Sequence, residues 1–146
     1  MLAYFDSSAL VKLVVDEQGS DLVAEIWDGC TAACASRLGY PEVRAALAAA
    51  ARHGTLSRSG HTTAKAEWEL YWSAVRPVEL TLAVEQSAGA AAESFRLAGA
   101  DAVHLASALA LEDPLVLVVA WDRRLRDGVH AAGLAVAPRT IDGRRR

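Results

Sequence analysis

Short apolar runs alternate with longer amphipathic stretches along this chain. The apolar runs predict strands at about 2–5, 30–35, 78–82, 115–121 and 134–137. Between them, apolar positions at helical spacing predict helices over about 7–16, 21–27, 36–53, 62–75, a stretch ending at 97, 101–111 and 122–132. Strands that alternate with helices predict a parallel sheet with helices on both faces. The pattern therefore indicates an α/β protein.

Turn and capping residues mark where these elements begin and end. Ser7 and Ser8 can cap the first helix, Gly54 ends an Ala-rich helix, and Asp113-Pro114 ends the helix before the longest apolar run. No linker, internal repeat or low-complexity tract divides the chain. We therefore expect one domain over 1–143, followed by a basic tail at 144–146.

The composition is that of a folded globular protein. The 146 residues are 53% hydrophobic and 23% charged. No apolar run approaches the roughly 18–20 residues that span a bilayer. Asp6 and Lys12 come too early for the apolar core of a signal peptide. These features predict a cytoplasmic protein without a membrane association.

The charge balance argues against a general nucleic-acid coat. The net charge is −3, and three of the 15 basic residues belong to the tail, so the body is more acidic still. An acidic body remains compatible with a nuclease whose carboxylates hold a metal ion while a few arginines contact the backbone. The candidates for such phosphate contacts are Arg37, Arg44 and Arg123.

Four acidic residues stand where the chain leaves a strand or enters a helix. Asp6 and Asp122 each follow an apolar run, whereas Glu42 and Asp101 lie at the beginnings of helices. The carboxyl ends of parallel strands face the crevice in which open α/β sheets bind ligands. Carboxylates gathered there would repel one another unless a hard cation lies between them. The set indicates a metal-dependent site that cleaves phosphodiesters.

Oxygen ligands select Mg²⁺ or Mn²⁺, and two cysteines alone exclude a thiol-rich zinc site. We assign Asp6, Asp101 and Asp122 as direct or water-mediated metal ligands. Glu42 could bind metal or orient the attacking water. Ser7 could hydrogen-bond a carboxylate or water, or it could simply cap the helix.

Each of these residues also has a structural explanation. The aspartates could be helix caps, and Glu42 could sit favourably in a first helical turn. His104 lies one turn from Asp101, but a single His in an apolar helix is more typical of a core. Trp68, Tyr71 and Trp72 could belong to the core or form a groove for a partner.

Four segments in order resemble the motifs of PIN domains. They are FDSSALVK at 5–12, SRLGYPEVR at 36–44, ADAVHLA at 100–106 and WDRRL at 121–125, with GLAV at 133–136 as the closing strand. The resemblance is to VapC-type toxins of bacterial toxin–antitoxin pairs, and it spans essentially the whole chain. Two regions depart from it. Residues 55–75 resemble nothing specific, and Gly128-Val129 stand where the family has small apolar residues, so we expect the last helix to be less regular.

The resemblance implies a PIN-like (RNase H-like) three-layer α/β/α sandwich with a central parallel sheet. It implies a Mg²⁺- or Mn²⁺-dependent endoribonuclease whose acidic positions are Asp6, Glu42, Asp101 and Asp122, with Ser7 as the small hydroxyl residue. A VapB-like antitoxin partner, an RNA substrate and a homodimer are further implications.

Other functions fit less well or remain open. A haloacid dehalogenase-like phosphatase needs a second Asp where this chain has Ser8, and a receiver domain needs a late Lys, whereas the lysines are Lys12 and Lys65. A PIN-fold nuclease of general RNA processing, or a non-catalytic PIN domain that only binds a partner, stays open as an alternative.

Overall fold

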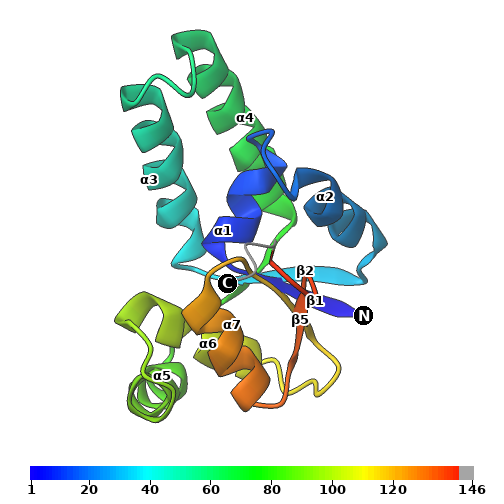
Figure 1. Cartoon of the computed structure of the whole chain (residues 1–146), viewed down its shortest axis with the longest axis vertical. Coiled ribbons are helices and arrows are strands. Elements are labelled where there is room, and N and C mark those ends of the chain that lie inside the picture. Colours follow the sequence, from blue (N-terminus) through cyan, green and yellow to red (C-terminus); the bar gives the residue numbers. More distant parts are fainter. Residues whose placement is uncertain (142–146) are drawn as a thin grey trace.

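The computed structural model describes residues 1–141, and its centre is a sheet of five parallel strands in the order β3-β2-β1-β4-β5. The elements along the chain are β1 (Leu2–Phe5), α1 (Ser7–Leu10), a 3₁₀ turn (Val11–Leu13), α2 (Ser20–Gly29), β2 (Ala32–Ser36), α3 (Gly39–Arg52), α4 (Arg58–Ala74), β3 (Arg76–Val78), α5 (Leu82–Ser94), α6 (Gly99–Leu109), β4 (Leu117–Val119), α7 (Arg123–Ala131) and β5 (Ala135–Ala137). Helices α1 to α4 cover one face of the sheet and α5 to α7 cover the other (Figure 1). The three-layer α/β/α architecture with a parallel sheet is confirmed.

Two separate cores fill the space on the two sides of the sheet. Successive side chains of a strand point to opposite faces, so Tyr4 enters the core under α5 to α7 while Ala3 and Phe5 enter the core under α1 to α4. The inner strands β1, β2 and β4 are buried on both sides, which explains why they appear in the sequence as continuous apolar runs rather than as alternating ones.

The core under α1 to α4 is rich in aromatic rings. Trp68 of α4 is fully buried, and its ring centroid lies 5.5 Å from that of Trp72 and 6.2 Å from that of Tyr40. Tyr71 and Trp72 are half-buried against the same core. Trp68 is therefore a core residue and cannot line a partner groove, because the side of α4 that carries it faces the sheet.

Several predicted boundaries were wrong for identifiable reasons. The first helix ends at Leu10 and tightens into the 3₁₀ turn, where Val11, Val14 and Val15 disfavour continued helix. The third strand lies at Arg76–Val78 rather than 78–82, because the Thr81 side chain accepts a hydrogen bond from the amide of Val84 and so begins α5.

The two cysteines do not share a strand as the run 30–35 predicted. Cys34 is buried in β2, whereas Cys30 is the C-cap of α2 and lies before the strand. Both thiols are free.

The topology determines where a site can form. The chain builds outward from β1 through β2 to β3 and then returns to place β4 on the other side of β1, so the strand order reverses between β1 and β4. Crevices at such switch points are where α/β sheets bind ligands. Within residues 1–141, no helix is long and apolar enough to cross a membrane. The predicted basic tail at 144–146, and the end of the predicted domain at 143, lie outside the described residues.

Candidate active site

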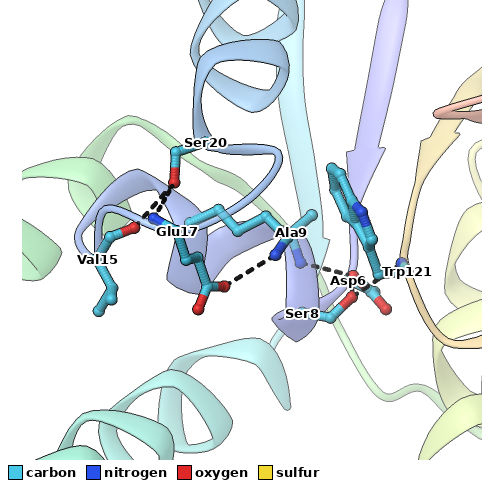
Figure 2. A network of polar contacts seen from close by, with 8 residues as sticks. Asp6, Ser8, Ala9, Val15, Glu17, Ser20 and Trp121 are labelled. Carbon is cyan, nitrogen blue, oxygen red and sulfur yellow. Dashed lines mark hydrogen bonds and ion pairs between the residues drawn. The ribbon is translucent and has the colours of Figure 1, made fainter. Parts of the chain in front are cut away.

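Asp6 leaves the end of β1 as a buried carboxylate held by two donors. Its Oδ1 accepts hydrogen bonds from the Ser8 hydroxyl at 2.7 Å and the Ala9 amide at 2.9 Å. The same Ser8 oxygen accepts from the amide of Trp121, at 3.1 Å, just beyond β4 (Figure 2). These bonds connect the ends of β1 and β4 across the switch point. They also make Asp6 the N-cap of α1, so the structural explanation for this residue holds as well.

The hydroxyl that bonds Asp6 belongs to Ser8, not to Ser7. Both serines follow Asp6 in the first turn of α1, and sequence alone does not show which of two adjacent hydroxyls turns back toward the carboxylate. Nor is Ser7 the cap of this helix, since Asp6 takes that position.

Glu42 is held by a chain of hydrogen bonds that begins in the core. Its Oε1 lies 2.7 Å from Nε2 of His104, and Nδ1 of the same ring lies 2.7 Å from the Tyr4 hydroxyl. The Tyr4 oxygen also accepts from the Ser36 amide at 3.2 Å. His104 is 2% exposed, so almost all of the ring is removed from water. The chain reaches from β1 and β2 through α6 to the first turn of α3.

The protonation of this chain follows from the burial of its phenol. Burial raises the pKa of Tyr4 well above its usual range, so the hydroxyl keeps its proton. A Tyr4 hydroxyl that donates to Nδ1 of His104 leaves Nε2 to donate to the Glu42 carboxylate. In this arrangement the imidazole bridges the buried Tyr4 phenol and the Glu42 carboxylate, and so orients Glu42.

Sequence reasoning gave His104 too small a role. The expectation of a core position is correct, but the ring also touches a predicted site residue. The available signal was its position three residues after Asp101, which places both side chains on one face of α6.

Asp101 and Asp122 complete the acidic set from α6 and α7. Asp101 lies in the first turn of α6, and Asp122 caps α7 by accepting from the Leu125 amide at 3.0 Å. Burial raises the pKa of Asp101, and the charges of Asp122 and Glu42 raise it further, while His104 and Arg124 lower it. The pKa of Asp101 is thus raised by the charges of both Asp122 and Glu42.

Asp6 belongs to the same electrostatic group. Burial raises its pKa to about 6, the Ser8 hydrogen bond opposes this rise, and the charge of Asp101 adds to it. Asp101 thus lies within electrostatic reach of Asp6, Glu42 and Asp122.

The donor set fits a hard divalent cation that keeps part of its water shell. Among the side chains of residues 1–141, no three from His, Cys, Asp and Glu group closely enough to hold an ion by themselves. Mg²⁺ is usually bound by one or two carboxylates together with water and substrate phosphate, rather than by an all-protein cage. Carboxylate oxygens from two or more elements meet that requirement.

Two of the three arginines expected to contact phosphate are in surface ion pairs. Arg37 pairs with Glu79 at 2.7 Å, and Arg44 pairs with Glu69 at 3.0 Å. Arg123 lies at the beginning of α7 and lines a surface hollow of about 340 Å³. Pairing between residues distant in sequence cannot be inferred from a single chain's spacing.

Comparison with known proteins identifies this α/β arrangement. A toxin–antitoxin complex from Klebsiella pneumoniae has the same fold, with a TM-score of 0.66 and 16% identity over 91% of this chain and 95% of that one. The sequence matches the PIN domain over residues 3–128. Ribonuclease VapC45 and Ribonuclease VapC49 of Mycobacterium tuberculosis are each 60% identical to it over 141 residues, or 97% of this chain and 98% of the relative. The chain belongs to the PIN-domain family and, within it, to the VapC type.

Proposed function

We propose that this protein is a metal-dependent endoribonuclease and the toxin of a toxin–antitoxin pair. The observation that carries the proposal is that Asp6 follows β1 and Asp122 follows β4, on the two sides of the switch point of the sheet. Asp101 lies within electrostatic reach of both and of Glu42. The names of the two ribonuclease relatives support the same activity.

Asp6, Asp101 and Asp122 are the residues that would hold Mg²⁺ or Mn²⁺. A bound divalent ion supplies a lowered pKa for a coordinated water and neutralises charge on the phosphate. Ser8 and the Ala9 amide fix the Asp6 carboxylate in one orientation before any ligand arrives. Glu42, held by His104, is oriented to accept a proton from the attacking water.

The test is cleavage of labelled RNA with Mg²⁺, with Mn²⁺ and with EDTA. The unaltered protein should cut with either metal, and EDTA should abolish cutting. Asp6→Asn and Asp101→Asn should each slow it by at least about 100-fold, since each removes a ligand charge. Asp16→Asn, on the exposed loop after the 3₁₀ turn, is the matched control and should cut normally. Cutting that survives EDTA or both site substitutions refutes the mechanism.

An antitoxin partner is proposed from two observations. The Klebsiella structure is itself a toxin–antitoxin complex. On this chain, Trp27, Leu70, Tyr71 and neighbouring residues line an apolar hollow of about 370 Å³, and Leu70 is 73% exposed. An amphipathic segment could place its apolar side chains in this hollow.

Co-expression with the small protein encoded beside the toxin tests the pairing. Expression of this chain alone should slow growth, and the neighbour should restore growth and copurify. Leu70→Asp should weaken copurification without changing RNA cleavage by the isolated protein. Harmless expression of an active nuclease that has no bound partner in its native host would favour the RNA-processing alternative. Homodimerisation remains a prediction, to be checked by sedimentation.

A further inference from the structure

We propose that Arg96 and Arg124 form a subsite for a backbone phosphate of the RNA next to the one that is cleaved. The two arginines line a hollow of about 320 Å³ together with Phe95 and Asp127. This inference rests on the proposed ribonuclease activity and adds the residues that would position its substrate.

Arg96 occupies a backbone position that normally selects glycine. It follows the end of α5 with φ of 54°, in the left-handed region, and the Leu97 amide closes the turn on the Ala92 carbonyl at 3.1 Å. A left-handed residue after a helix is usually glycine, because any Cβ is disfavoured there. Strain of this kind often accompanies functional positions.

No contact within the described chain accounts for an arginine at this position. Over residues 1–141 the Arg96 guanidinium makes no hydrogen bond or ion pair. The buried side chain next to it is that of Leu97, which is 7% exposed and packs in the core. The turn is thus held by Leu97, and the Arg96 side chain is available to a ligand.

Arg124 places the hollow beside the acidic residues. It stands in the first turn of α7, two residues after the helix-capping Asp122. In agreement with this position, its charge lowers the pKa of Asp101. An RNA strand whose scissile phosphate lies at the acidic set could therefore place a neighbouring phosphate over Arg124 and Arg96.

The charge of the hollow matches one phosphodiester. Two guanidinium groups and the Asp127 carboxylate leave one positive charge, and guanidinium donors fit phosphate oxygens in pairs. Three other arginines near the site are already engaged, whereas Arg123 lines a separate hollow. Arg126 donates to the carbonyls of Ala120 and Pro138, and Arg37 and Arg44 hold acidic partners.

The left-handed backbone of Arg96 allows a substitution that separates RNA binding from stability. Arg96→Gly removes the cation and relieves the left-handed strain, so the melting temperature should rise by about 2–4 °C while RNA binding weakens. The matched control is Glu112→Gly. Glu112 has φ of 53° after α6 and lines a different hollow, so its replacement should give a similar stabilisation and unchanged RNA binding.

Binding is measured by fluorescence anisotropy in EDTA, with a labelled single-stranded RNA of mixed sequence and about 20 nucleotides as the probe. Arg96→Gly and Arg124→Gln should each weaken binding by about fivefold to tenfold. Each should also reduce the slope of log K against log salt by about 0.7, the value for one lost phosphate contact. Asp127→Asn should have the opposite effect and tighten binding about twofold to threefold, since it removes the negative charge from the hollow.

Three results overturn the subsite: an unchanged salt slope in Arg96→Gly, an equal loss in Glu112→Gly, or no RNA binding by the unaltered protein. The proposed function fails separately. If the unaltered protein binds this RNA with the expected salt dependence but cuts no RNA with Mg²⁺ or Mn²⁺, the subsite stands and the nuclease does not.

Discussion

The acidic site has one buried side and one exposed side, and the two are built differently. On the buried side, Asp6 and His104 are 3% and 2% exposed, and hydrogen bonds occupy Oδ1 of Asp6 and both ring nitrogens of His104. On the exposed side, Asp122, Arg123 and Arg124 begin α7 at the surface. Asp6 and His104 are held in place by the fold, whereas Asp122, Arg123 and Arg124 remain in water. Substitutions on the buried side should therefore change the stability strongly, and substitutions on the exposed side should change it little.

The largest stability effect is expected at His104. His104→Ala would leave the buried Tyr4 hydroxyl without its ring partner and open a cavity, at a cost of about 3–5 kcal/mol in the free energy of unfolding. Urea denaturation measures this loss. His130→Ala, on the exposed face of α7, is the control and should cost less than about 1 kcal/mol. Similar midpoints for the two variants would mean that the chain from Tyr4 to Glu42 does not hold the buried side.

Asp6 should make the protein less stable as the pH rises. Its folded pKa of about 6 lies above the ordinary value of 3.8, because burial disfavours the charged form. Between these values the folded state keeps the proton that the unfolded state releases, so stability falls from about pH 4 to pH 6 and stays reduced above.

Asp6→Asn removes the cost of burying a charged carboxylate, and its amide oxygen can still accept hydrogen bonds from Ser8 and Ala9. In EDTA the variant should be more stable than the unaltered protein by up to about 3 kcal/mol at pH 7, and nearly equal to it below pH 4. Urea midpoints across this range measure the difference. A gap that does not change with pH would show that Asp6 is not destabilised by its own charge.

Sequence alone predicted the frame of the site because the frame follows from local patterns. Asp6 and Asp122 end apolar runs, and the alternation of strands and helices implies that parallel strand ends meet at one edge. Their placement needed no knowledge of side-chain contacts. The same holds for the first-turn positions of Glu42 and Asp101.

Sequence could not predict which side chains pair across the fold. The contact of His104 with Glu42 joins α6 to α3, and the ion pair of Arg37 with Glu79 joins the end of β2 to the residue after β3. Both depend on tertiary packing. The choice of Ser8 over Ser7 depends on a side-chain orientation that neighbouring positions in one helical turn do not reveal. The predicted strand at 78–82 was wrong because Thr81, inside that apolar run, caps a helix.

A divalent ion bound between the buried and exposed sides of the site should stabilise the protein by less than the changes expected at His104 and Asp6. At ten times the dissociation constant of Mg²⁺, linkage gives about 1.4 kcal/mol, or about 3–5 °C in melting temperature. Differential scanning fluorimetry with and without Mg²⁺ measures this shift. Asp101→Asn should abolish it and Asp16→Asn should retain it. An equal shift in both variants would place the ion elsewhere.

The smallest stability effect is expected at Asp122, on the exposed side. Asp122→Asn keeps an N-cap oxygen for the Leu125 amide, and Asn caps helices about as well as Asp, so the melting temperature in EDTA should change by less than about 2 °C. Loss of the charge should nevertheless remove the Mg²⁺ stabilisation and reduce RNA cleavage by at least about tenfold. Asp122→Ala separates the two roles, because it should lose the cap as well and cost a further 1 kcal/mol or so. Normal cleavage in Asp122→Asn would leave this residue with its capping role alone and would reduce the exposed side to its arginines.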